Sequence, residues 1–267
     1  MYMSVVDRNT PTVDFFNQYN MTNMGFVKRL SNAGFDTVWS VATIHQPIKI
    51  ARALGIPSDE MVKMVHMAQK KTAMVIKRKE LRLPEGVPLW FDIETNLRWN
   101  RIWLIGVLDE ADNHVYQFFA KDWNEYDMML EFDAFLKARP NRPLLYYSCN
   151  NFDIRVTRNV ARRLGMDDHA IFTQPEMDIC RPLRDAFFIP TTNRKLKTIA
   201  RFLGFDMTLE DRDDYMDGKE CAMHYEEHIK YGTPLDPNVF TYNANDVKML
   251  PFILRRLEEL SIRTNGY

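Results

Sequence analysis

Acidic side chains in three separate stretches of the 267-residue sequence have spacings that suit metal-dependent chemistry. Asp92 and Glu94 flank Ile93 at the end of an apolar run, and alternate residues of a strand point to the same face. Both carboxylates can therefore face one point, where a hard cation such as Mg²⁺ or Mn²⁺ would relieve the repulsion between them. Acids are common at strand ends, so this pair alone is a weak indication of a site.

Two further acids lie on predicted helices. Asp153 follows the apolar strand that ends at Tyr147 and stands at a helix start, where a capping role would also explain it. Asp246 comes four residues after Tyr242, so the phenol and the carboxylate share one helical face. Neither stretch is informative by itself. An acid pair on a strand followed by acids on two helices, in this order, is much less expected by chance.

The segments that carry these acids have the pattern of an α/β domain. Apolar runs at residues 89–93, 101–108 and 114–119 are separated by polar turns and predict three consecutive strands, which form a meander. A helix around residues 128–136, a buried strand at 144–147 and further helices to the C-terminus follow. This order predicts a mixed sheet flanked by helices.

The first part of the chain is predicted to be a small all-helical domain. Residues 23–80 show short helical patterns ended by Gly34 and Gly55, and the longest predicted helix runs roughly from 59 to 78. The proline- and glycine-containing segment 81–87 interrupts regular structure. We therefore expect a helical domain over residues 1–85, with a role in binding nucleic acid or a partner, and an α/β domain over residues 86–267.

Composition and charge limit the class of protein. With 46% hydrophobic and 27% charged residues, the chain is expected to fold as a globular protein. The three cysteines have no C-x-x-C spacing, which argues against a disulfide scaffold or zinc knuckle and favours a reduced, cytoplasmic setting. We expect no secretion signal and no membrane span.

The charge is distributed unevenly along the chain. Residues 1–85 contain 12 Lys and Arg against 7 Asp and Glu, a balance of +5, although the whole chain has a net charge of −1. The remaining residues therefore carry −6. A basic binding part beside an acidic, metal-holding part would explain this difference, and so would solvated faces on two unrelated domains.

Taken together, the residues resemble the DEDD exonuclease superfamily, in its tyrosine-containing branch with the RNase H fold. The resemblance covers about residues 86–258 and rests on four acids and one tyrosine, which are Asp92, Glu94, Asp153, Asp246 and Tyr242. The triplet 178–180 and the basic segment 194–200 agree with it, whereas residues 147–150 depart from the Tyr-Asn-Gly of many relatives. The helical part is similar to modules found beside RecB-like and RNase H-like nucleases.

The resemblance implies a hydrolase that removes nucleotides one at a time from a 3′ end. Two ions of Mg²⁺ or Mn²⁺ would be held by the four acids, and Tyr242 would orient the attacking water. The expected partner is nucleic acid with a free 3′ end, with single-stranded DNA favoured because an unpaired end needs no unwinding. The residues expected to contact it are Asn151, Arg155, Arg158, Lys195 and Lys197.

Other functions remain open at this stage. An exoribonuclease would carry the same acids, because nothing in the sequence reads a 2′-hydroxyl. A domain that binds nucleic acid without cutting it is a second alternative, although the presence of all four acids argues against it. His224 and His228 have the spacing of a zinc protease helix, but Tyr225 stands where the catalytic glutamate would be required.

Overall fold

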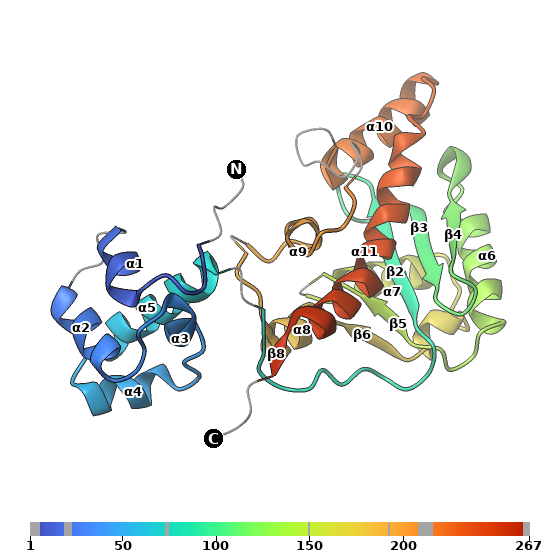
Figure 1. The fold of residues 1–267 in the computed structure, drawn as a ribbon. Coiled ribbons are helices and arrows are strands. Elements are labelled where there is room, and N and C mark those ends of the chain that lie inside the picture. The colour runs from blue at the N-terminus through green and yellow to red at the C-terminus, as the bar shows by residue number, and fades with distance from the viewer. Residues whose placement is uncertain are drawn as a thin grey trace. The chain divides into compact units, whose positions relative to one another are not determined.

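The computed structural model describes residues 6–18, 23–72, 75–148, 150–191, 193–207 and 216–263. The chain divides into two compact units (Figure 1). Unit 1 takes residues 1–79, 186–192 and 258–267, and unit 2 takes residues 80–185 and 193–257. Within the described ranges, every helix is too short or too polar to span a lipid bilayer.

Unit 1 contains the predicted N-terminal helical region. Its helices are α1 (Thr12–Gln18), α2 (Met24–Asn32), α3 (Val38–Ala42), α4 (Pro47–Leu54) and α5 (Ser58–Lys71). Thr37 and Ser40 form a reciprocal capping box at the start of α3, and Gly55 ends α4 with a left-handed φ of 61°. Their apolar faces enclose one core that includes Phe15, Leu30 and Met61.

A small three-stranded sheet completes unit 1 with segments from distant parts of the chain. The predicted helix at 59–78 ends early, at Lys71, and Ile76–Lys77 forms strand β1 instead. β1 pairs antiparallel with β7 (Phe187–Phe188) and parallel with β8 (Ile262–Arg263). The Lys77 ammonium also donates to both carboxylate oxygens of Glu258, at 2.9 and 2.8 Å. The basic end of the predicted helix therefore belongs to a sheet.

Unit 2 is built on the predicted mixed sheet, whose strand order is β4-β3-β2-β5-β6. The strands are β2 (Leu89–Thr95), β3 (Ile102–Asp109), β4 (His114–Phe119), β5 (Leu144–Tyr146) and β6 (Glu176–Asp178). β2, β3 and β4 form the expected antiparallel meander, and β5 and β6 are added in parallel. The fold is the expected RNase H-like arrangement.

Helices flank this sheet and connect its strands (Figure 1). The longer ones are α6 (Glu125–Lys137), α7 (Phe152–Arg163), α10 (Gly218–Tyr231) and α11 (Asn238–Leu260). The shorter ones are η1 (Lys121–Trp123), η2 (Ala170–Phe172), α8 (Cys180–Ala186) and α9 (Leu196–Phe202). α6 leads from β4 to β5, and α7 leads from β5 towards β6.

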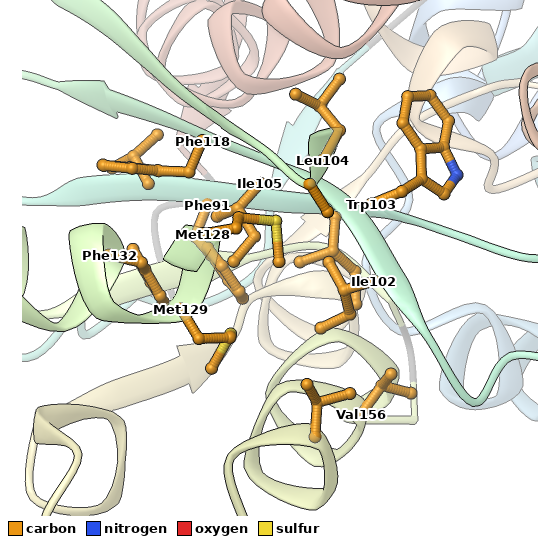
Figure 2. Close-up of a cluster of buried hydrophobic side chains, with 14 of the residues drawn as sticks. Phe91, Ile102, Trp103, Leu104, Ile105, Phe118, Met128, Met129, Phe132 and Val156 are labelled. Carbon is orange, nitrogen blue, oxygen red and sulfur yellow. The ribbon is translucent and has the colours of Figure 1, made fainter. Parts of the chain in front are cut away.

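The two faces of the sheet are buried by different helices. On one face, Phe91 and Phe118 from the strands meet Phe132 of α6 (Figure 2), with the rings of Phe91 and Phe132 stacked at 5.8 Å. On the other face, Val247 and Leu250 of α11 pack in one cluster with Trp90 of β2. Because side chains alternate along β2, its even-numbered residues face α11. The alternation therefore directs Asp92 and Glu94 to the α11 face.

A buried ion-pair network surrounds Asp109, the last residue of β3. Asp109 is 2% exposed and accepts hydrogen bonds from Arg139 Nε at 2.7 Å and from Arg142 Nη1 and Nη2 at 2.9 and 2.5 Å. Burial alone would raise the pKa of Asp109, but the hydrogen bonds from Arg142 and Arg139 outweigh it and lower this pKa to about 2.

We expect Asp109→Ala to lower the free energy of unfolding by about 3 kcal/mol, because two half-buried guanidinium groups lose their acceptor. Urea denaturation at pH 7, followed by circular dichroism, measures this loss. Because the pKa of Asp109 is lowered from 3.8 in the folded state, its contribution is present above pH 4 and disappears as the pH falls towards 2. Asp112→Ala, in the exposed turn after β3, is the control, and equal losses in both variants would contradict the prediction.

Candidate metal centre

The carboxylates of β2 meet an acid from the middle of α11. Asp92, Glu94 and Asp246 each offer an oxygen, and these three atoms lie within 4.8 Å of one another. Glu94 and Asp246 are only 5% and 9% exposed, and Asp92 is half-buried. Over the residues that the structure describes, no other set of three or more His, Cys, Asp or Glu side chains comes together in this way.

Asp153 comes from a third element, the first turn of α7. It is buried, and its negative charge raises the pKa of both Asp92 and Glu94. It does not belong to the set of oxygens that share the 4.8 Å separation. The structure thus brings three of the four predicted acids together and places the fourth within their electrostatic reach.

The loop that leads into α7 is held by Asp178 at the end of β6. One carboxylate oxygen of Asp178 accepts from the Ser148 backbone N–H at 3.2 Å, and the other accepts from the Ser148 hydroxyl at 2.9 Å and the Asn151 N–H at 3.1 Å. Asn151 itself has a left-handed φ of 54°. These contacts fix the turn that precedes Asp153.

Simultaneous ionisation of these carboxyl groups is unfavourable when no cation is bound. Burial raises the pKa of Asp92 well above its ordinary value, and the charges of Glu94 and Asp246 raise it further, against a hydrogen bond from Asn243. Burial and the charge of Asp246 likewise raise the pKa of Glu94. Burial, opposed by hydrogen bonds and joined by neighbouring carboxylates, raises the pKa of Asp153 to about 7.

This donor set fits a hard divalent cation. All the converging ligand atoms are carboxylate oxygens, which Mg²⁺ and Mn²⁺ prefer, and no sulfur or imidazole nitrogen belongs to the set. A bound cation would replace the repulsion between the buried carboxylates with attraction. The side chains that could hold it are Asp92, Glu94 and Asp246, with Asp153 close enough to add its charge.

Tyr242 lies one helical turn before Asp246 on α11 and is largely buried. Burial and the nearby charges of Asp246 and Glu94 raise the pKa of Tyr242, so its phenol stays protonated near neutral pH. The ammonium of Lys197 lies 3.6 Å from the centre of the Tyr242 ring. Lys197 is only 7% exposed, and its positive charge lowers the pKa of Glu94.

The other predicted nucleic-acid contacts differ in their exposure. Asn151, Arg155 and Lys195 are exposed. Arg158 is half-buried, and its Nε donates to the Ile171 carbonyl at 3.2 Å. Its Nη1 also lies 3.5 Å from a carboxylate oxygen of Glu176. Three of the five predicted contacts are thus open to solvent. Arg158 is held by contacts inside the domain, and Lys197 is buried beside the Tyr242 ring, next to the acids.

A family model of the RNase H superfamily matches residues 89–258, which is more than half of the chain. The chain belongs to the RNase H superfamily. No curated protein and no solved structure gives a significant match. The matched segment of this RNase H superfamily protein begins at β2 and ends in α11, so it contains all four acids and Tyr242.

Sequence reasoning missed the polar residues that surround the acids. Asn243 donates to Asp92 Oδ2 at 3.0 Å, and it lies against Gly106 of β3. An isolated glycine within an apolar strand indicates a close approach of another group, so Gly106 was a usable signal. In the segment with zinc-protease spacing, His224 is exposed, His228 hydrogen-bonds to the Thr233 carbonyl, and Tyr225 stacks on Trp103 in the core.

Proposed function

We propose that the protein is a metal-dependent 3′→5′ exonuclease of the DEDD superfamily, in its tyrosine branch, and that single-stranded DNA is its preferred substrate. The convergence of Asp92, Glu94 and Asp246 on one point carries this proposal. Membership of the RNase H superfamily supports nucleic acid as the substrate class. The protonated Tyr242 beside the acids supports the tyrosine branch.

The residues would divide the work of phosphodiester hydrolysis among them. Two bound Mg²⁺ or Mn²⁺ ions would lower the pKa of a water and neutralise charge on the leaving 3′ oxygen. Asp92, Glu94 and Asp246, with Asp153 nearby, would hold those ions. The phenol of Tyr242 is kept protonated by its surroundings, so it can donate a hydrogen bond that orients the attacking water.

Lys197 and the exposed polar residues would contact the substrate. Asn151 and Arg155 lie at the start of α7, the helix that carries Asp153. Lys195 is the N-cap residue of α9, the helix that carries Lys197. Positive side chains and helix starts are the groups that commonly contact phosphates and position a strand without reading its sequence.

We also propose that the helical region of unit 1 binds nucleic acid or a partner protein. The +5 balance of residues 1–85 supports this role, because basic surfaces attract phosphate backbones.

The expected cytoplasmic setting stays a prediction from the cysteine content.

Shortening of labelled oligonucleotides tests the proposal. Matched single-stranded DNA and RNA, labelled at the 5′ end, are incubated with the full chain and Mg²⁺ or Mn²⁺, with a chelator in the control reaction. We expect a ladder of products shortened from the 3′ end, formed faster on DNA and absent with the chelator. Faster shortening of RNA would assign an exoribonuclease instead. Tight, salt-sensitive binding without shortening under either ion would contradict nuclease activity and favour a binding domain.

A further inference from the structure

Three residues on neighbouring strands form a row that faces α11. In the register of the sheet, Asp92 of β2 lies opposite Gly106 of β3, and Gly106 lies opposite Gln117 of β4. Residues directly opposite one another in an antiparallel pair share a face. The row therefore runs from the Asp92 carboxylate of the candidate metal centre, across a position without a side chain, to an amide on the edge strand.

Asn243 of α11 fills the space above the glycine. Its side chain is fully buried, and a Cβ placed on Gly106 would lie 2.1 Å from Asn243 Oδ1 and 2.8 Å from Cγ. Such distances are far below van der Waals contact, so any larger residue at this position would have to displace the amide. Gly106 thus gives Asn243 room to lie between Asp92 and Gln117.

The hydrogen bonds of this row can run in only one direction. The carbonyl of Phe240 can only accept, so Gln117 must present its amide nitrogen there, at 2.8 Å. The second N–H of the same nitrogen points to Asn243 Oδ1 at 3.1 Å. Asn243 must then turn its own NH₂ group towards Asp92, to which it donates at 3.0 Å. A backbone carbonyl therefore fixes which end of Asn243 meets the carboxylate.

We propose that Asn243 is a positioning residue for the metal centre: it holds the Asp92 carboxylate in the orientation that places an oxygen beside Glu94 and Asp246. Gln117 and Gly106 act through Asn243, the first by fixing the direction of its amide and the second by giving it space. This inference rests on the proposed metal-dependent function. It adds three residues, Asn243, Gln117 and Gly106, that do not bind the ion themselves. They hold the Asp92 carboxylate in the orientation in which it can bind the ion.

Calorimetric titration of Mn²⁺ into the full-length protein, without nucleic acid, tests the inference. Groups that orient a metal ligand typically contribute a factor of about 10–100 to metal affinity, and we expect Asn243→Ala to weaken Mn²⁺ binding by that factor. Gln117→Met leaves every acid and Asn243 in place, so we expect a smaller loss of about threefold to tenfold.

Gln174→Met is the matched control for Gln117→Met. The Gln174 amide nitrogen also donates to two acceptors, the carbonyls of Arg139 and Arg142, but it lies just before β6, at the strand end opposite to the acids. We expect this variant to lose stability and to bind Mn²⁺ with wild-type affinity. If Asn243 only joined α11 to the sheet, Gln117→Met and Gln174→Met would both lose stability and would both bind Mn²⁺ with wild-type affinity.

Gly106→Ala separates the effect on packing from the effect on the metal. Its added methyl group clashes with Asn243, so we expect both a lower melting temperature and weaker Mn²⁺ binding. In the double variant Gly106→Ala/Asn243→Ala the clash is gone, so the melting temperature should recover at least partly. Mn²⁺ affinity should stay low in the double variant, because the donor to Asp92 is still missing.

The outcomes distinguish this inference from the proposed function. Wild-type Mn²⁺ affinity in a folded Asn243→Ala protein would overturn the positioning role and leave the metal centre standing. If Asn243→Ala does not fold, wild-type affinity in Gln117→Met overturns it instead. Failure of the wild-type protein to bind Mn²⁺ at all would overturn both the inference and the metal-dependent function.

Discussion

Asp92→Asn is expected to slow shortening of single-stranded DNA by at least about a thousandfold, because loss of one ligand charge removes roughly 4 kcal/mol of transition-state stabilisation. Asparagine keeps the size of the side chain and can still accept the hydrogen bond from Asn243. It cannot supply the negative charge that the cation needs. Single-turnover rates at saturating DNA and Mg²⁺ measure the effect on chemistry.

The same substitution should stabilise the metal-free protein, which excludes unfolding as the cause of lost activity. Burial and the charges of Glu94 and Asp246 raise the pKa of Asp92, so ionised Asp92 is unfavourable in the folded state. Removing that charge therefore raises the melting temperature near pH 8 in the presence of a chelator. Asp112→Asn, in the exposed turn before β4, is the control for both measurements. An undiminished rate in Asp92→Asn would reject the assigned role.

Mn²⁺ or Mg²⁺ is expected to raise the melting temperature by roughly 5–10 °C at pH 8 when the ion is at 100 times its dissociation constant. An ion that binds only the folded state raises the free energy of unfolding by about 2.7 kcal/mol at this excess. In a protein of this size, each kcal/mol raises the melting temperature by about 2–4 °C. The ion would bind carboxylates that repel one another in the folded chain, and in the unfolded chain Asp246 is far from Asp92 and Glu94. Differential scanning fluorimetry with and without each ion measures the shift.

The shift should shrink to near zero at pH 5. The pKa of Asp153 is raised from 3.8 to about 7, and those of Asp92 and Glu94 are raised as well. For acids with raised pKa, the folded state holds more protons than the unfolded state, so their contribution to stability is full at low pH and declines from about pH 4 upward. Asp153 is thus protonated at pH 5, and the raised pKa values of Asp92 and Glu94 make protons stronger competitors of the ion as the pH falls. Equal shifts at pH 5 and pH 8 would contradict this account.

The sheet of unit 2 could be predicted because its strands have strong patterns. Three consecutive apolar runs predicted the meander, and alternation along β2 predicted that Asp92 and Glu94 share a face. The structure adds that this face is the one covered by α11, which carries Asp246. Spacing alone could not show that β2 and α11 meet, because residues 94 and 246 are far apart in the chain.

The remaining features depend on contacts that leave no periodic signal. The contact between Asn243 and Gly106 requires the register of three strands and the placement of a helix over them. β1, β7 and β8 are only two residues long, too short for alternation to be visible, and the sequence pattern predicts the end of a helix where β1 lies. Arg155 and Arg158 are three residues apart, which places both on one helical face. Only the hydrogen bond from Arg158 to the Ile171 carbonyl shows that Arg158 turns into the domain.

Anomalous diffraction from crystals of the full chain soaked in Mn²⁺ tests the central claim most directly. The claim is that Asp92, Glu94 and Asp246 together hold a divalent cation. We expect an anomalous peak within coordination distance of oxygens from all three carboxylates, about 2.0–2.3 Å away. A structure without a peak there, or with these carboxylates turned apart while Mn²⁺ binds elsewhere, would contradict the claim.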